Sequence, residues 1–114
     1  MIDTHCHLYS EELAADIDGV MERAEKAGVG KFFLPAIDQS TADSMFALEA
    51  SYPGRCYAMI GLHPCSVTAT YQQELNFVKD CLKQRVFAGI GETGLDFYYF
   101  NRLSCNTGKI YSCF

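Results

Sequence analysis

The feature that most constrains the fold is a regular alternation of short apolar runs with amphipathic stretches. Four apolar runs have strand length, at residues 1–4, 31–37, 55–61 and 86–91. Three stretches between them place apolar residues at helical spacing, at residues 10–29, 40–53 and 70–85. This pattern predicts parallel strands joined by right-handed helical crossovers, in the order β-α-β-α-β-α-β. Two architectures share that order: an open doubly wound sheet and part of a (β/α)8 barrel.

Local signals predict where the helices begin and end. Gly28 suits the left-handed position just past the end of the first helix. Ser40 with Asp43 is a start signal for the second helix. Thr70 and Gln73 have the same relation at the start of the third.

The composition indicates a globular domain. Of the 114 residues, 49% are hydrophobic and 20% are charged. No apolar run approaches the roughly 18–20 residues of a membrane span, and the N-terminus has no signal-peptide pattern. We therefore expect a cytoplasmic protein with no membrane partner. The six cysteines are irregularly spaced, which favours thiols over disulfides.

The net charge of −5 disfavours a purely electrostatic nucleic-acid binder, which would need a basic face. It does not exclude a nuclease, because bound divalent cations can supply the positive charge that the side chains lack.

Chemistry-bearing residues gather at the predicted strand ends. The chain opens MIDTHCHL, and alternation along a strand predicts that Asp3, His5 and His7 share one face. The third run ends in GLHP with His63, and the fourth in GETGLD. Because the carboxyl ends of parallel strands share one face, we expect the three histidines to meet Glu92 there.

These residue types predict a metal site. His5 and His7 can chelate one cation, and Glu92 can bridge two, so Glu92 is a candidate metal ligand and catalytic residue. A helix cap or an ion pair is the structural alternative for Glu92. His63 is a candidate catalytic residue that reaches a substrate phosphate or a water on the metal, or else makes a structural hydrogen bond. Asp3 and Asp96 are candidates for orienting a ligand histidine, with helix capping an equal alternative for Asp96.

Together, MIDTHCHL, GLHP and GETGLDFYY resemble the TatD family of metal-dependent deoxyribonucleases, within the amidohydrolase-like superfamily. The resemblance covers about residues 1–99. It implies a TIM-type (β/α)8 barrel, of which the chain holds the N-terminal portion of about four β/α units. It also implies two divalent cations (Mg, Mn or Zn), with His5 and His7 as ligands of one and Glu92 bridging both. The implied activity is hydrolysis of DNA phosphodiester bonds, of 3′–5′ exonuclease type.

The chain departs from that family in length and in its last residues. Members run to about 250 residues, the usual size of such a barrel. Their later metal ligands, two histidines and an aspartate, have no counterpart, because no histidine follows His63. Residues 100–114 form an atypical tail without an acidic residue or a helical stripe. We expect a truncated or frame-shifted product with an incomplete site and weak or no activity.

Three further expectations follow from the same residues. Four parallel strands leave both sheet edges open, which predicts self-association through those edges. A metal-dependent phosphoesterase of another H-x-H hydrolase family is one alternative function. A non-catalytic α/β module that binds a metal or a partner is the other.

Overall fold

The computed structural model describes residues 1–94, which form one parallel sheet with helices on a single side. Its strands are β1 (Ile2–Asp3), β2 (Lys31–Pro35), β3 (Cys56–Ile60) and β4 (Gly89–Ile90). They are hydrogen-bonded in chain order, β1-β2-β3-β4, and every pair is parallel.

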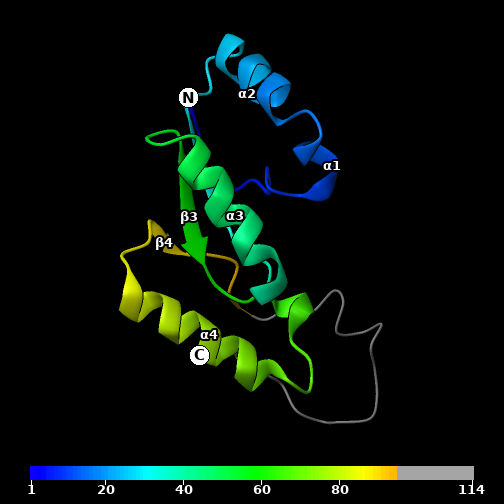
Figure 1. The fold of residues 1–114 in the computed structure, drawn as a ribbon, viewed down its shortest axis with the longest axis vertical. Coiled ribbons are helices and arrows are strands. Elements are labelled where there is room, and N and C mark those ends of the chain that lie inside the picture. The colour runs from blue at the N-terminus through cyan, green and yellow to red at the C-terminus, as the bar shows by residue number, and fades with distance from the viewer. Residues whose placement is uncertain (95–114) are drawn as a thin grey trace.

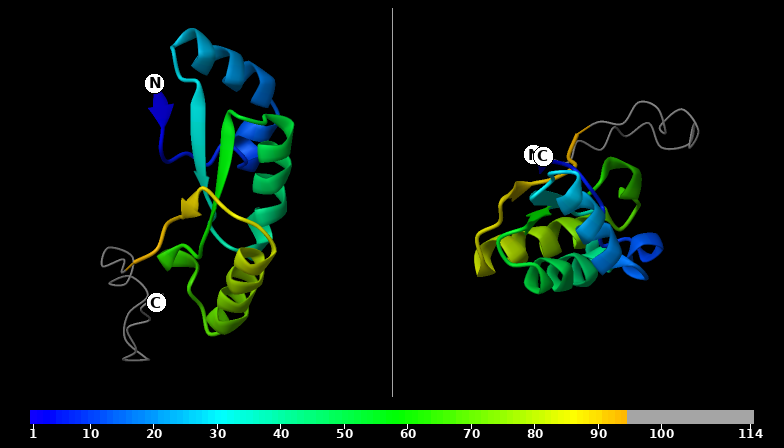
Figure 2. Two further views of the ribbon diagram at one scale, coloured as in Figure 1. Left: turned by 90° about the vertical axis from the view of Figure 1, so that its left-hand side faces the viewer. Right: turned by 90° about the horizontal axis from the view of Figure 1, so that it is seen from above.

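This strand order decides between the two predicted architectures. In a doubly wound sheet the strand order reverses once and helices cover both faces, whereas a barrel keeps chain order and carries its helices outside. The helices lie along one side of the sheet in both views of Figure 2. The chain is therefore the N-terminal portion of a TIM-type barrel, as the sequence predicted.

The helices largely occupy the predicted stretches, with two differences. They are α1 (Glu11–Ala14), α2 (Ile17–Lys26), α3 (Gln39–Ser51) and α4 (Tyr71–Gln84), with a short 3-10 turn, η1 (Pro64–Ser66). The single helix expected over residues 10–29 is thus divided into α1 and α2.

The start signal predicted for the second helix was wrong. The cap of α3 is Asp38, whose Oδ1 accepts a hydrogen bond from the Thr41 amide at 3.2 Å. The Thr41 hydroxyl oxygen accepts in return from the Asp38 amide at 3.3 Å. This reciprocal pair gives the amides of Asp38 and Thr41 each a hydrogen-bond partner at the start of the helix, which favours Asp38 over Ser40 as the cap. Gly28, with φ of +81°, follows the end of α2 as predicted. Thr70 is the residue before α4 as predicted, but its side chain makes no capping hydrogen bond.

The core lies between the sheet and the helices. Alternate residues of β2 and β3 face the helices and are buried: Phe32, Leu34, Cys56, Ala58 and Ile60. Met21 of α2, Met45 and Leu48 of α3, and Cys81 of α4 pack against them.

The opposite face of the sheet carries the remaining strand residues. Phe33 and Tyr57 stack across β2 and β3 with ring centroids 5.2 Å apart, and the Lys31 ammonium lies 5.6 Å from the Tyr57 ring. This face corresponds to the interior of a complete barrel. Self-association through the two edge strands stays a prediction.

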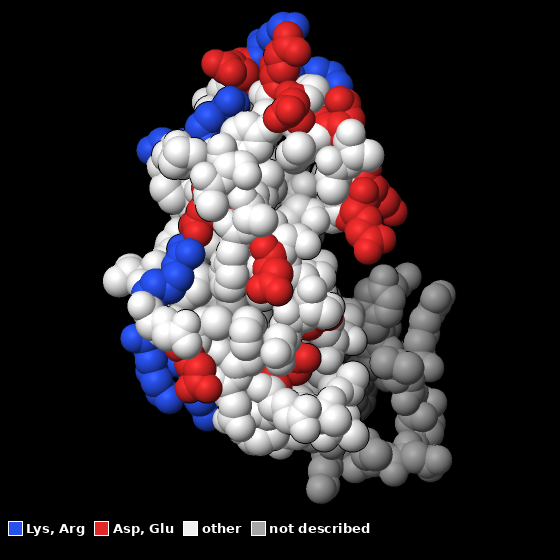
Figure 3. All heavy atoms as spheres, in the orientation of Figure 1, with Lys and Arg blue, Asp and Glu red and all other residues white. Residues whose placement is uncertain are grey.

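On the face drawn in Figure 3, basic side chains of residues 1–94 lie mainly along one edge and at one end, interspersed with acidic ones. They form no continuous basic tract there, which agrees with the net charge of −5. Within the described part of the chain, no helix is long and apolar enough to cross a membrane.

Candidate metal centre

The segment after β1 brings the first two histidines to the end of the sheet. The strand stops at Asp3, whose Oδ1 accepts a hydrogen bond from the His5 amide at 3.1 Å. The Cys6 amide then donates to the carbonyl of Phe33 in β2 at 3.1 Å. Alternation along a continuous strand is therefore not what brings His5 and His7 together. Asp3 turns the backbone, and β2 holds the segment in place.

Burial around this segment affects its thiol. Cys6 is half-buried, and its Sγ is 3.7 Å from the Phe33 carbonyl oxygen. Burial, reinforced by the negative charge of Asp3, raises the pKa of the Cys6 thiol to about 12. In the metal-free chain the Cys6 thiol is therefore protonated at physiological pH.

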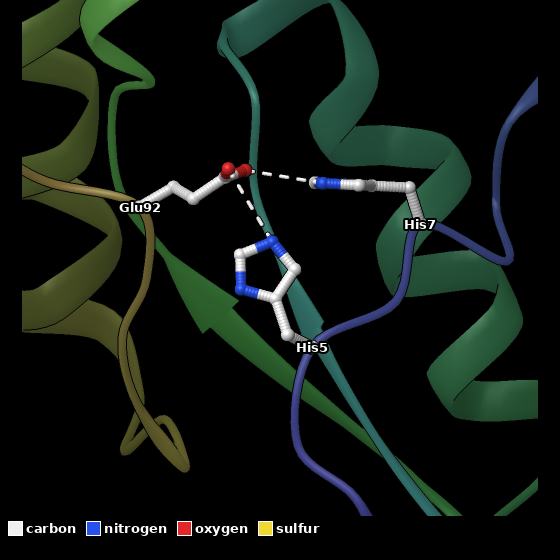
Figure 4. Close-up of side chains that lie close together, drawn as sticks. All are labelled: His5, His7 and Glu92. Atoms are coloured by element: carbon white, nitrogen blue, oxygen red, sulfur yellow. Dashed lines mark ion pairs between the residues drawn. The ribbon is translucent and has the colours of Figure 1, made fainter. Parts of the chain in front are cut away.

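Glu92 follows β4 and points its carboxylate at the histidines. His5 Nε2 lies 3.3 Å from Oε1, and His7 Nε2 lies 3.1 Å from Oε2 (Figure 4). Glu92 adopts a φ of +46°, in the left-handed region that few non-glycine residues occupy. Strain of this kind persists where surrounding structure enforces it and concentrates at functional sites.

Close packing of β3 against β4 sets the position of Glu92. A Cβ added at Gly61 would lie 1.9 Å from the carbonyl oxygen of Gly91. A Cβ added at Gly91 would lie 2.7 Å from Cβ of Pro35. A side chain at either position would therefore displace the backbone that precedes Glu92.

His63 reaches the same carboxylate from the end of β3. Its amide donates to the Ile37 carbonyl at 2.8 Å, and its Nε2 lies 3.1 Å from Glu92 Oε1. Its Nδ1 accepts a hydrogen bond from the Cys65 amide at 3.0 Å. A neutral His63 therefore carries its proton on Nε2 and offers a hydrogen-bond donor, not a lone pair, to the site.

The donor set fits a divalent cation. One oxygen and two imidazole nitrogens, from Glu92, His5 and His7, lie within 4.8 Å of one another. Glu92 Oε2 is buried and accepts no hydrogen bond from any of residues 1–94, despite its closeness to His7 Nε2. A buried carboxylate oxygen without a donor is costly unless positive charge faces it. Nitrogen and carboxylate ligands suit Zn, Mn or Mg to differing degrees.

The structure adds a neighbour that the sequence did not indicate. Tyr9 is buried, and its hydroxyl oxygen lies 2.8 Å from Nδ1 of His7. Burial, together with the negative charge of Glu92, raises the pKa of the Tyr9 hydroxyl above its ordinary value. No spacing rule singles out a tyrosine two residues after a histidine. Of the predicted site residues, His5, His7, His63 and Glu92 converge. Asp3 accepts a hydrogen bond from the His5 amide, and Asp96 is outside the described residues.

Comparisons with known proteins agree with this geometry. The chain is 33% identical over 99 residues to the uncharacterized metal-dependent hydrolase YjjV of Escherichia coli K12, covering 85% of this chain and 38% of that protein. It is 30% identical over 97 residues to the 3′-5′ ssDNA/RNA exonuclease TatD of Yersinia pseudotuberculosis, covering 85% and 37%. The crystal structure of YjjV matches with a TM-score of 0.75 and 31% identity, over 86% of this chain and 38% of that one.

The chain thus spans about two fifths of the length of these relatives. A family model described as TatD related DNase matches residues 2–106, which takes in β1 to β4 and all four residues that converge on the site. That match, over most of the sequence, shows that the chain belongs to the TatD-related DNase family.

Proposed function

We propose that this chain carries part of the active site of a metal-dependent phosphodiesterase that acts on DNA. The observation that carries the proposal is the meeting of His5 and His7 with the carboxylate of Glu92, whose backbone is strained and whose Oε2 is buried. The family membership and the exonuclease name of the Yersinia relative support the choice of substrate class.

In this proposal the three ligand side chains have distinct tasks. His5 and His7 would hold one divalent cation through Nε2, and the carboxylate of Glu92 would complete the set. When bound, the cations supply positive charge that neutralises phosphate oxygens and favours attack on phosphorus. A second cation would need further ligands, since residues 1–94 bring only these three groups into coordinating distance.

His63 acts on the substrate side. With Nδ1 occupied by the Cys65 amide, its proton on Nε2 faces Glu92 Oε1 at 3.1 Å and can pass to a phosphate oxygen that enters beside Glu92. An imidazole that presents N–H is a poor metal ligand, because coordination needs the lone pair. His63 therefore binds substrate, and it does not complete the cation site.

Calorimetric titration with Mn²⁺ tests the cation site, because manganese prefers nitrogen and oxygen ligands and avoids the six cysteines. The wild-type chain should bind one Mn²⁺. Glu92→Gln should weaken binding by about 100-fold or more, beyond the usual cost of losing a mere supporting contact. Glu22→Gln, which alters an exposed glutamate of α2 paired with Lys26, is the matched control and should bind as the wild type does. Equal Mn²⁺ affinity in all three chains would refute the proposed ligands.

Hydrolysis of single-stranded DNA tests the substrate proposal. We expect negligible Mn²⁺-dependent digestion by the isolated chain, because three ligands do not fix two cations in the arrangement that hydrolysis requires. Robust digestion that Glu92→Gln abolishes would show instead that the chain is a complete enzyme. Preference for free phosphomonoesters over DNA would favour a phosphoesterase of another kind.

A further inference from the structure

Tyr9 occupies a position that none of the proposed ligand roles explains. Its side chain is buried, and its hydroxyl lies between an imidazole of the site and the backbone of the sheet. The hydroxyl oxygen is 2.8 Å from His7 Nδ1 and 2.5 Å from the carbonyl oxygen of Pro35, the last residue of β2. The two contacts join His7 to a strand rather than to solvent.

The two contacts together determine which nitrogen of His7 carries the proton. A tyrosine hydroxyl has one hydrogen, and a carbonyl oxygen can only accept. Two oxygens 2.5 Å apart need a hydrogen between them, so we assign the Tyr9 hydrogen to Pro35, and the Tyr9 oxygen is then an acceptor toward His7. His7 Nδ1 is then the donor, and a neutral His7 has its lone pair on Nε2, facing Glu92.

This arrangement agrees with the carboxylate oxygen that receives no hydrogen bond. Nε2 of a His7 protonated on Nδ1 has no hydrogen to give to Glu92 Oε2, although the two atoms are 3.1 Å apart. Two electron pairs that face each other at this distance repel, and a cation between them removes the repulsion. His63 has the opposite arrangement, since the Cys65 amide occupies its Nδ1.

We propose that Tyr9 is a positioning residue that fixes His7 in the tautomer with a free lone pair on Nε2, and anchors its ring to the end of β2. The proposal rests on the proposed cation site. In this proposal the Pro35 carbonyl orients the Tyr9 hydroxyl, and the Tyr9 hydroxyl determines which nitrogen of His7 faces the cation. Support of this kind for a ligand histidine commonly changes metal affinity by about 10–100-fold.

Long-range ¹H–¹⁵N correlation spectra of the metal-free wild-type chain at pH 8 test the tautomer directly. His7 should be protonated on Nδ1 and His63 on Nε2. A wild-type His7 protonated on Nε2 would overturn the proposal, and this measurement requires no variant. It also stands apart from the proposed function: failure of the wild type to bind Mn²⁺ would refute the cation site and leave the tautomer result intact.

Tyr9→Phe tests the consequence for binding. This variant keeps the ring and removes the oxygen, so His7 should populate both tautomers and Mn²⁺ affinity should fall by about 10–100-fold. Tyr57→Phe is the matched control, because it also removes a hydroxyl bonded to a carbonyl, that of Gly54 at 2.9 Å, outside the site. An unchanged His7 tautomer in Tyr9→Phe, with Mn²⁺ affinity equal to that of Tyr57→Phe, would overturn the role of Tyr9.

Discussion

The helix-covered face of the sheet and the end that carries Glu92 are built in opposite ways. Leu34, Met45 and Ala58 on the covered face are fully buried and apolar. At the strand ends, the side chains of His5, His7 and Glu92 are 53%, 30% and 20% exposed, and Glu92 has left-handed backbone and a carboxylate oxygen without a hydrogen bond. The first region stabilises the fold, whereas the second keeps unsatisfied groups that a ligand can satisfy.

Truncation of a core side chain should have the largest effect, and that effect should be on stability. Leu34→Ala should lower the free energy of unfolding by roughly 2–5 kcal/mol, because the cavity opens between β2 and the helices. Chemical denaturation followed by circular dichroism measures the change. Val86→Ala, at a position 92% exposed, serves as the control and should change stability little. Similar losses in both variants would show that the covered face is not the stabilising region.

Substitution of the site histidines should distinguish a histidine that binds the cation from one that does not, by the change in Mn²⁺ affinity. His7→Gln removes a nitrogen that faces the carboxylate and should weaken Mn²⁺ binding by about 100-fold, more than the loss of a supporting contact. His63→Gln should leave Mn²⁺ affinity nearly unchanged, since its Nε2 presents a hydrogen. Calorimetric titration of the two variants side by side gives the comparison. Equal losses would place His63 among the ligands.

A substitution that relieves the backbone strain at Glu92 should show how much that strain lowers the free energy of unfolding. Glu92→Gly should abolish Mn²⁺ binding, yet raise the stability of the metal-free chain by up to about 1 kcal/mol, because glycine accepts a positive φ. Glu92→Gln retains the strain and is the matched control. If the glycine variant unfolds more easily than the glutamine variant, the strain argument fails.

Ionisation of a core thiol gives the smallest effect at neutral pH. Burial raises the pKa of Cys56 from its ordinary 9.0 to about 11. Above pH 9 the unfolded chain loses this proton first, so the free energy of unfolding should fall as pH rises from about 9 to about 11. Below pH 9 the thiol is protonated in both states and contributes no pH dependence. Cys56→Ala should show a shallower decline over this window in denaturation curves; an equal slope would contradict the assignment.

Long-range order was readable from the sequence because it follows from regular patterns. The alternation of apolar runs with helical stretches predicted parallel strands, and parallel strands bring their carboxyl ends to one edge. His63 and Glu92 could therefore be placed together although 28 intervening residues separate them. The resemblance of MIDTHCHL, GLHP and GETGLDFYY to TatD nucleases then chose the barrel over the open sheet.

Local geometry was less readable because side chains compete for the same backbone groups. Asp38 and Ser40 both suit a helix start, and the reciprocal bond with Thr41 decided for Asp38. The His5 amide bonds to Asp3, so β1 ends earlier than the apolar run suggested. Tyr9 was missed because its partner, the Pro35 carbonyl, is distant in sequence and belongs to the backbone. The predicted boundary at residue 99 and the role of Asp96 stay predictions.

The close approach of Gly61 to the Gly91 carbonyl has a consequence for how the site can be lost. One methyl group at position 61 would act as a wedge between β3 and β4, since its carbon would stand 1.9 Å from that oxygen. Because Glu92 directly follows Gly91, the wedge would carry the carboxylate away from all three imidazoles at once. A substitution at Gly61 would thus disrupt the centre without altering a ligand, a charge or a hydrogen-bonding group. The absence of a side chain at Gly61 is therefore as necessary for the centre as any of its histidines.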